Sequence, residues 1–397
     1  MVFVGGRGFL PAVEPVVRDS ARAWAVLMCR HARLGASCSQ AMVKLPAELW
    51  LRIFALAASD WGEHLHLLTT MQAMAEVLQV ADVSSTTVWR TITDNASDIP
   101  AVQTFRAGSV SCLPLLSVTA IAPVRSFDRQ LLAVGTTPKS SDEWDIELWD
   151  VNDPSGEPLG MLVGHTRPVV ALAERCGVLV SGGLDKTVRL WDLAAGRCID
   201  TQTVRPCSDL SERDEGDGNI GVRIVACSEA HLACYVDREW AEVLIDVYDV
   251  GGEWNPQSTS AAYARSLAVD SENGRAAHDG DICALAALPR GGLASGGEDE
   301  RVRLWELSSG ECTATLEVGA PVYSLCVAAQ QRVLASGDAA GWIKVWCLET
   351  AACLHSFQAH GNEQVNCLAP HSSSGGLVSC GHDACIRVWS PARPCDI

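Results

Sequence analysis

The sequence predicts an all-β propeller of six blades, or seven if residues 198–275 hide a second irregular blade, preceded by a small all-α domain. Three observations lead to this prediction. A unit in which Ser lies ten residues before Trp occurs four times, and in three of these Asp lies six residues before Trp. The motif aromatics of successive units are 41 to 57 residues apart. Short runs rich in β-branched residues, separated by Gly and Asp turns, fill each unit, as the blades of a propeller require.

The motif aromatics are Trp149, Trp191, Tyr248, Trp305, Trp346 and Trp389.

The composition excludes several classes of protein. A net charge of −18 over 397 residues disfavours binding to phosphate backbones, so no nucleic-acid partner is expected. No apolar run reaches the roughly 18 residues of a membrane helix, so no membrane partner is expected either. The 17 cysteines include no Cys-x-x-Cys pair, and several recur at fixed repeat positions. We therefore interpret them as small buried hydrophobic residues and expect no metal and no cofactor.

Residues 1–43 are expected to form a flexible N-terminal extension. Within them, Val13 to Leu34 could form an amphipathic helix with several arginines on its polar side. An organelle-targeting segment is the alternative, which Glu14 and Asp19 weaken because such segments are poor in acidic residues. The arginines are Arg18, Arg22, Arg30 and Arg33.

From residue 44 to 92 the apolar residues change to helical spacing. Leu45-Pro46 suits the first turn of a helix, and Leu49 and Ile53 follow one turn apart. A second run over 64–85 has the same character and leads to Trp89. We expect a helical domain of about 50 residues, whose thin core must pack on the propeller or on a partner.

This segment resembles an F-box, whose pattern is Leu-Pro-x-Glu-Leu, then Ile-Phe, then Val-Ser and Trp. An unrelated helical hairpin is the alternative. The resemblance implies docking onto a Skp-family adaptor and, through it, onto a cullin ubiquitin ligase. The pattern falls on Leu45, Pro46, Glu48, Leu49, Ile53, Phe54, Val83, Ser84 and Trp89. The implied adaptor-binding residues are Leu45, Pro46, Leu49, Ile53 and Phe54.

Residues 96–397 are expected to form the propeller. Four strands are predicted in each unit, for example PVVALAE, GVLVSGG, TVRLWDL and CIDTQTV around Trp191. The unit around Tyr248 lacks the Ser–Asp–Trp spacing, and the polar stretches 208–219 and 251–260 on its two sides are expected to be surface insertions. The last unit lacks a fourth strand, and we expect residues 100–108 to supply it and close the ring.

Three Ser/His/Asp sets raise the question of catalysis. An active site is normally built once, whereas these sets recur with a Trp each time and without a Gly-x-Ser-x-Gly elbow, so we expect a structural role and no enzyme. The units resemble WD repeats, in which such residues form a hydrogen-bonded network that holds the blade turns. The predicted network residues are His165, Ser181, Asp185, Trp191, His278, Ser295, Asp299, Trp305, His360, Ser379, Asp383 and Trp389.

The resemblance to WD propellers also implies a ligand-binding face, formed by residues before each turn Asp and early in each first strand. No Arg occupies these positions, which puts recognition of phosphorylated peptides in doubt. Tyr323 is the expected aromatic anchor. The eight positions are Val170, Leu184, Cys283, Glu298, Tyr323, Ala339, Asn366 and His382.

Two functions remain open at this point. The first is the substrate-recognition subunit of a Skp–cullin–F-box ubiquitin ligase, with the helical domain on the adaptor and the propeller on an unknown substrate protein. The second is a WD-repeat scaffold for protein complexes unrelated to ubiquitin. Either function would place the chain in the cytoplasm or the nucleus, because no secretory signal is evident.

Overall fold

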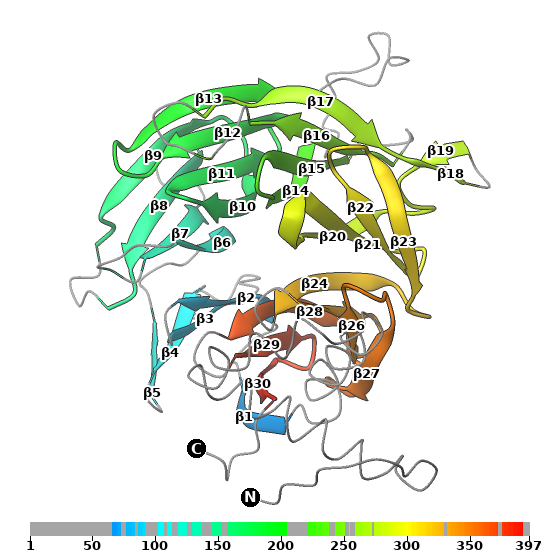
Figure 1. Cartoon of the computed structure of the whole chain (residues 1–397). Coiled ribbons are helices and arrows are strands. Elements are labelled where there is room, and N and C mark those ends of the chain that lie inside the picture. The colour runs from blue at the N-terminus through cyan, green and yellow to red at the C-terminus, as the bar shows by residue number, and fades with distance from the viewer. Residues whose placement is uncertain are drawn as a thin grey trace, which may run out of the picture.

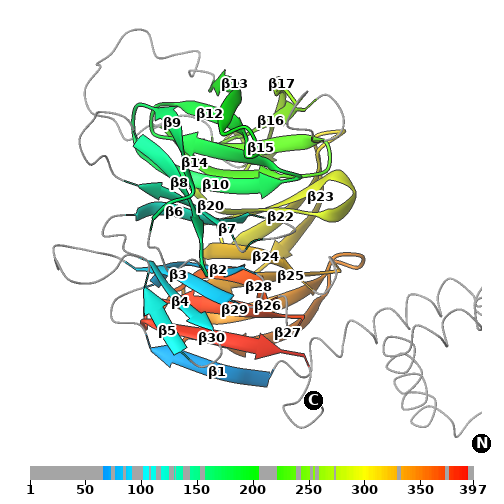
Figure 2. The same ribbon diagram turned by 90° about the vertical axis from the view of Figure 1, so that its left-hand side faces the viewer.

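The computed structural model contains seven four-stranded antiparallel sheets arranged as the blades of a ring (Figures 1 and 2). The larger of the two blade counts is therefore the correct one. The structure describes residues 66–72, 77–83, 86–91, 102–106, 109–112, 118–124, 129, 131–136, 144–152, 157–204, 221–237, 243–250, 254, 259–271, 274–328, 332–371 and 375–391.

Each of the first three blades uses four consecutive strands. Blade 1 contains β2 (Val77–Val83), β3 (Thr86–Thr91), β4 (Val102–Arg106) and β5 (Ser109–Cys112). Blade 2 contains β6 (Val118–Val124), β7 (Leu131–Thr136), β8 (Trp144–Asp150) and β9 (Gly160–His165). Blade 3 contains β10 (Val169–Arg175), β11 (Val178–Gly183), β12 (Thr187–Asp192) and β13 (Arg197–Thr203).

The remaining blades follow the same plan until the last. Blade 4 contains β14 (Gly221–Cys227), β15 (His231–Asp237), β16 (Ile245–Asp249) and β17 (Ala262–Leu267). Blade 5 contains β20 (Ile282–Ala287), β21 (Gly292–Gly297), β22 (Arg301–Glu306) and β23 (Glu311–Glu317). Blade 6 contains β24 (Val322–Ala328), β25 (Val333–Asp338), β26 (Trp342–Cys347) and β27 (Cys353–Gln358). Blade 7 contains β28 (Val365–His371), β29 (Gly376–Gly381), β30 (Cys385–Ser390) and β1 (His66–Gln72).

Two small elements lie outside the blade strands, one between blades 4 and 5 and one between β20 and β21 of blade 5. A hairpin joins β18 (Val269–Ser271) to β19 (Gly274–Ala276), and a 3-10 turn, η1, spans Pro289–Gly291. None of the helical structure in the described part of the chain is long and apolar enough to cross a membrane.

The hydrophobic core lies between neighbouring blades. Strand side chains alternate between the two faces of a sheet, and both faces of a blade are covered, so the inner strands are apolar nearly throughout. In β11, for example, all six residues are buried. One cluster joins Val180 and Leu190 of blade 3 to Val222 and Leu232 of blade 4. The contacts continue round the ring, with β28 of blade 7 lying against β2 of blade 1.

The ring is closed by β1, which pairs antiparallel with β30 from His66↔Ser390 to Gln72↔Cys385. The prediction that residues 100–108 close the last blade is wrong, because residues 102–106 form β4 in blade 1. The reasoning that an open edge must be covered holds, but the covering strand comes from about 30 residues earlier in the chain.

Blade 1 corrects the predicted helical domain over 44–92. The second helical run and the residues that follow it, up to Thr91, instead form β1, β2 and β3, so the described part of the propeller begins at residue 66 rather than at 96. The run is rich in Leu, Ala, Met and Gln, which are good helix formers. Helix propensity is a weak determinant, and burial in a sheet overrides it here. Val80 and Trp89 of this run pack against Val378 and Ile386 of blade 7.

The same correction affects the F-box resemblance. Val83 lies in β2 and Trp89 in β3, where the Trp89 side chain is 1% exposed, so the second half of the pattern belongs to a blade. The first half, from Leu45 to Phe54, falls outside the described residues.

The insertion between β16 and β17 of blade 4 is more than a surface loop. Trp254, within 251–260, is buried against Val250 and Tyr263, and its indole Nε1 donates to the Ser228 carbonyl oxygen at 2.9 Å. The amide of Ala261 donates to Asp200 of β13 at 2.7 Å. The insertion therefore ties blade 4 to blade 3. The other predicted insertion, 208–219, lies outside the described residues.

Candidate functional site: the network face of the propeller

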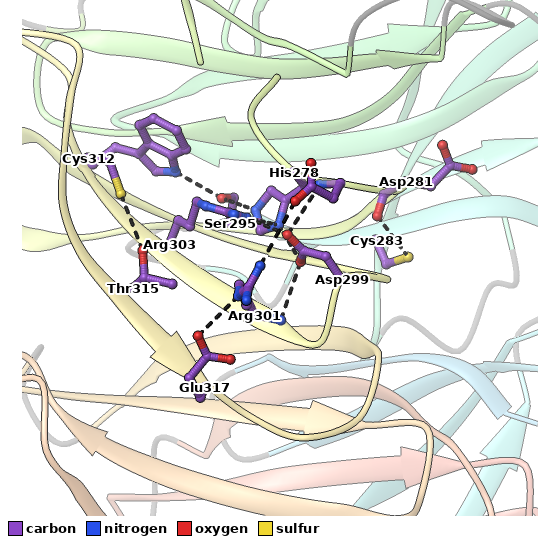
Figure 3. A network of polar contacts seen from close by, with 12 residues as sticks. His278, Asp281, Cys283, Ser295, Asp299, Arg301, Arg303, Cys312, Thr315 and Glu317 are labelled. Carbon is purple, nitrogen blue, oxygen red and sulfur yellow. Dashed lines mark hydrogen bonds and ion pairs between the residues drawn. The ribbon is translucent and has the colours of Figure 1, made fainter. Parts of the chain in front are cut away.

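Blades 3, 5 and 7 each contain the same chain of hydrogen bonds. In blade 5, Trp305 Nε1 donates to Ser295 Oγ at 2.8 Å, Ser295 Oγ lies 2.6 Å from His278 Nε2, and His278 Nδ1 lies 2.8 Å from Asp299 Oδ1 (Figure 3). The corresponding distances in blade 3 are 2.8, 2.7 and 2.8 Å, and in blade 7 they are 2.8, 2.8 and 2.9 Å. The structure thus brings together all twelve predicted network residues.

The chemistry of these groups fixes the direction of the bonds. An indole N–H can only donate, so the serine oxygen accepts from Trp and its own proton goes to His Nε2. The neutral histidine therefore carries its proton on Nδ1 and donates to the Asp carboxylate. Each histidine lies just before a first strand and each Asp in the turn before a third strand, so the chain of bonds fastens two loops at one end of the blade.

Charge and burial act together in these networks. Burial lowers the pKa of His278 and of His360, and outweighs the opposing effects of Asp299 and Asp383. Burial by itself raises the pKa of Asp185, but hydrogen bonding and charge from His165, with the hydrogen bonds from Thr187 and the Thr166 amide, lower it to about 2. The networks of blades 5 and 7 therefore hold a neutral imidazole beside an ionised carboxylate at neutral pH.

The turn that each Asp holds has an uncommon backbone. The residue after the Asp has a positive φ: 64° at Lys186, 63° at Glu300 and 55° at Ala384. This left-handed conformation costs non-glycine residues about 1–2 kcal/mol. The Asp carboxylate accepts a hydrogen bond from the backbone amide two residues on, for example from Thr187 N to Asp185 Oδ1 at 3.0 Å, and so stabilises the turn.

Arginines two residues before the motif Trp join two of the networks. Arg303 Nη1 lies 2.5 Å from Asp299 Oδ2, and Arg387 Nη1 lies 2.5 Å from Asp383 Oδ2. The Arg303 side chain is 6% exposed, so the buried carboxylate has a paired cation. These arginines are therefore part of the blade rather than free to bind a ligand.

Blade 6 keeps the Ser–Trp pair but holds its turn differently. Trp346 Nε1 donates to Ser336 Oγ at 2.9 Å, while Val318 stands at the place of His278 and Ala340 at the place of Asp299. Asp338, which takes the place of Gly297, accepts from the amides of Ala340 and Trp342, both at 2.9 Å.

Asp338 thus holds the blade 6 turn without a histidine, a role that the repeat pattern did not predict. The absence of a histidine together with an Asp at the usual Gly position was the available signal. Lys344 Nζ donates to the Val318 carbonyl oxygen, so a cation again lies two residues before the Trp.

The irregular blades use other buried polar pairs. In blade 2, Trp149 Nε1 donates to Glu147 Oε2 at 2.9 Å. In blade 1 the indole lies on the second strand, where Trp89 Nε1 donates to Gln103 Oε1 at 3.1 Å. The blade is irregular because its third strand carries no Trp, and this is why the six-unit count of the sequence missed it.

The burial of the Ser/His/Asp sets argues against hydrolysis. Ser181, Ser295 and Ser379 are each 0% exposed, and each hydroxyl already accepts from Trp and donates to His. A nucleophilic serine must reach a substrate carbonyl, and these cannot. The described residues also contain no group of three or more His, Cys, Asp or Glu side chains arranged to hold a metal ion.

The eight predicted binding positions lie at the end of the propeller where the networks lie, which we call the network face. Glu298 and His382 are exposed, whereas Leu184 is only 8% exposed. Val170, Cys283, Tyr323, Ala339 and Asn366 are half-buried. Asn366 Nδ2 donates to the Val77 carbonyl oxygen at 2.9 Å, so this residue joins blades 7 and 1.

The network face is acidic over blade 5. Burial, then Glu298 and Asp281, raise the pKa of the Cys283 thiol to about 12. Burial, then the neighbouring Cys283 and Glu298, raise the pKa of Tyr323. Asp281, which the repeat alignment did not select, is exposed and accepts from the Tyr235 hydroxyl at 3.1 Å. A thiol with so high a pKa is a poor nucleophile.

The cysteines in repeat register are free thiols, but they are not all buried. Cys326 is buried, Cys198, Cys283, Cys312 and Cys367 are half-buried, and Cys353 is exposed. On the fourth strands the sulfur donates to the carbonyl two residues on, as in Cys198 to Asp200 at 3.2 Å. The expectation of uniformly buried hydrophobic residues is therefore wrong for the fourth-strand positions. There the cysteine lies next to a register shift in the strand pairing, and its thiol donates a hydrogen bond at that point.

Comparisons with known proteins agree with this architecture. The family described as "WD domain, G-beta repeat" matches residues 156–192, 273–306 and 351–390. Small ribosomal subunit protein RACK1y of Oryza sativa subsp. japonica is 26% identical, over 63% of this chain and 87% of the rice protein. Striatin of Mus musculus is 25% identical, over 74% of this chain but 35% of striatin. Target of rapamycin complex subunit wat1 of Schizosaccharomyces pombe is 27% identical, over 54% of this chain and 74% of that protein.

Solved structures show the same fold. The WD40 β-propeller domain of Doa1 superposes with a TM-score of 0.62 at 16% identity, covering 83% of this chain and 98% of that chain. The matched repeats include the networks of blades 3, 5 and 7. The chain thus carries WD40 repeats and folds as a WD40 β-propeller of seven blades.

Proposed function

We propose that the chain is a protein-interaction scaffold whose propeller presents the network face to partner proteins. One observation carries the proposal. The polar residues that recur in the repeats hold the loops through hydrogen bonds, whereas the exposed side chains on the same face differ from blade to blade. Glu298 and His382 are exposed there, and Tyr323 on blade 6 is half-buried near Glu298. A rigid face with an aromatic anchor and charged neighbours suits protein binding rather than chemistry.

The similar proteins support a scaffold more than a ubiquitin-ligase receptor. Those named above are described as a small ribosomal subunit protein, striatin and a target of rapamycin complex subunit. The finer hypothesis of a Skp–cullin–F-box receptor rests on Leu45 to Phe54, which lie outside the described residues, and half of its sequence pattern belongs to blade 1. The scaffold is therefore the function we favour.

The test is affinity purification with mass spectrometry on the full chain and two face variants, Glu298→Lys and Tyr323→Ala. We expect both to lose the same set of partner proteins. Glu311→Lys is the matched control, since it makes the same charge change in the same blade. Glu311 lies at one end of the β22–β23 pair, and Arg301↔Glu317 lies at the other end. Equal recovery of all partners by the face variants and the control would contradict the proposal.

A parallel purification with Leu45→Ala/Pro46→Ala separates the two functions. A scaffold keeps its partners in this variant. If the wild type carries a Skp-family adaptor and a cullin, and the double variant loses them, the ubiquitin-ligase function replaces the scaffold as the better account.

A further inference from the structure

The outer strand of blade 2 differs from the other outer strands whose side chains are described. Leu159, Met161 and Val163 are 44%, 48% and 47% exposed, and they form an apolar stripe along β9. Between them, Leu162 is 1% exposed and packs against Trp191 of blade 3. Successive side chains of a strand point to opposite faces, so the stripe lies on the side of β9 away from blade 3.

The strand registers show how unusual this stripe is. Met161 pairs with Glu147, two residues before Trp149. The residues in the same place on the outer strands of blades 3, 5 and 6 pair with Arg189, Arg303 and Lys344, and they are Thr201, Thr315 and Ser356, all exposed. The place of Val163 is taken by Thr203, Glu317 and Gln358, which are also exposed. Polar residues are the rule at these two places, whereas blade 2 has Met161 and Val163 there, and with Leu159 they leave a continuous apolar stripe exposed. Such a stripe indicates a surface that another segment covers.

The sequence that leads into the stripe is acidic, although Glu147 within it is buried and accepts from Trp149 Nε1. Residues 141–157, which lead into the stripe, contain seven acidic residues and no Lys or Arg. Glu157 is exposed and Asp150 is half-buried. The acidic residues of this segment are Asp142, Glu143, Asp145, Glu147, Asp150, Asp153 and Glu157. An apolar stripe with an acidic margin fits an amphipathic segment that carries cations beside its apolar side.

One segment of this chain has that chemistry. Residues 13–34 contain four Arg against Glu14 and Asp19. If they are helical, Val17, Trp24 and Met28 fall on one side, and the four arginines on the other. The segment lies outside the described residues, and the 31 residues from 35 to 65 that join it to β1 can span up to about 100 Å when extended. We infer that residues 13–34 dock on the stripe of β9, with their arginines towards Asp150 and Glu157. This contact is independent of the network face and of its ligands.

Photo-crosslinking in the full-length chain tests the contact. Met161→p-benzoylphenylalanine should form crosslinks to residues 13–34 in a product of monomer mass, located by mass spectrometry. Thr315→p-benzoylphenylalanine, at the matching place in blade 5, should form none to that segment. Crosslinks from position 161 only to a second copy of the chain, or none to residues 13–34, would overturn the inference.

Hydrogen exchange on unlabelled chains provides a second measurement. Met161→Thr/Val163→Thr gives β9 the residues that β13 has at these places, so the blade should remain folded. We expect amides within 13–34 to exchange several-fold faster in this variant, and the amides of β9 to exchange faster when Trp24→Asp and Met28→Asp are introduced together. Thr201→Ser/Thr203→Ser serves as the control. Unchanged exchange in both regions would show that the segment and the stripe do not meet.

Discussion

Blades 5 and 6 are neighbours that solve the same problem by different means. Blade 5 fastens its turn with His278 from outside the strand pair, an ionised Asp299 and Arg303. Blade 6 fastens its turn from within, with Asp338 at the end of β25. The left-handed position of the turn is Glu300 in blade 5 and Gly341, with φ of 81°, in blade 6. The comparison teaches that the buried Ser–Trp pair is constant, while the means of holding the turn depend on how strained the turn is.

The largest effect should come from the element that the two blades share. Trp305 is 1% exposed, and Trp305→Ala should lower the free energy of unfolding by about 3–5 kcal/mol, because it leaves a large cavity. Trp346→Ala should cost a similar amount, since its bond to Ser336 is the same. Denaturant unfolding measures both. A much smaller cost in blade 6 would show that the shared Ser–Trp pair is not the common foundation of the two blades.

A swap of the two arrangements sharpens the comparison. A Cβ at Gly297 would lie 2.8 Å from His278 Nδ1, so Gly297→Asp alone should destabilise the protein by about 1–3 kcal/mol. Adding His278→Val removes that clash and gives positions 278 and 297 the residues that blade 6 has at 318 and 338, so it should recover part of the loss. The summed losses of the two single variants give the stability expected without coupling. If the double variant is no more stable than that, the idea that Asp338 replaces the histidine is refuted.

The turn residue provides the next test. Gly341→Ala places a Cβ in a left-handed backbone and against the carbonyls of Gly361 and Glu363, so we expect a loss of about 1–2 kcal/mol or more. Glu300→Ala is the matched control, because Glu300 already holds this conformation with a side chain that is exposed, and should change the stability by about 0.5 kcal/mol or less. Thermal unfolding of the two variants distinguishes these outcomes.

Acidity should affect the two blades in opposite directions. Burial lowers the pKa of His278, so the unfolded chain binds more protons than the folded one below about pH 6.5, and blade 5 loses stability as the pH falls through that range. Burial raises the pKa of Asp338, although its hydrogen bonds oppose the shift, so blade 6 loses stability as the pH rises above about 4. Hydrogen exchange between pH 4 and 7, corrected for intrinsic rates, should show opposite trends in β22 and β26. Parallel trends would contradict the assignment of the two turns.

The smallest effect is expected from restoring the missing Asp of blade 6. Ala340 is exposed, and without a histidine at 318 a carboxylate there has no imidazole to hold. Ala340→Asp should therefore change the free energy of unfolding by about 0.5 kcal/mol or less. A gain above about 1 kcal/mol would mean that the Asp acts without its histidine.

Much of the fold could be read from the sequence where the repeat is regular. The four strands predicted around Trp191 match β10 to β13, because alternation and turn residues agree with burial there. Blade 1 could not be read, since its residues favour helix locally and its Trp89 stands on the second strand. Asp338 was missed for a related reason: its role exists only because no histidine fills the space beside it.

The sequence by itself determined the repeat period, the three regular networks and the absence of arginine from the predicted binding positions, because these depend on spacing along the chain. Only the tertiary structure decided that β1 closes blade 7 and that residues 77–112 form a blade. Only the tertiary structure also decided that Trp254 is buried and that the stripe of β9 is exposed. The reason is that closure, burial and exposure are set by neighbours brought together by the ring, such as β28 against β2, which lie far apart in the chain.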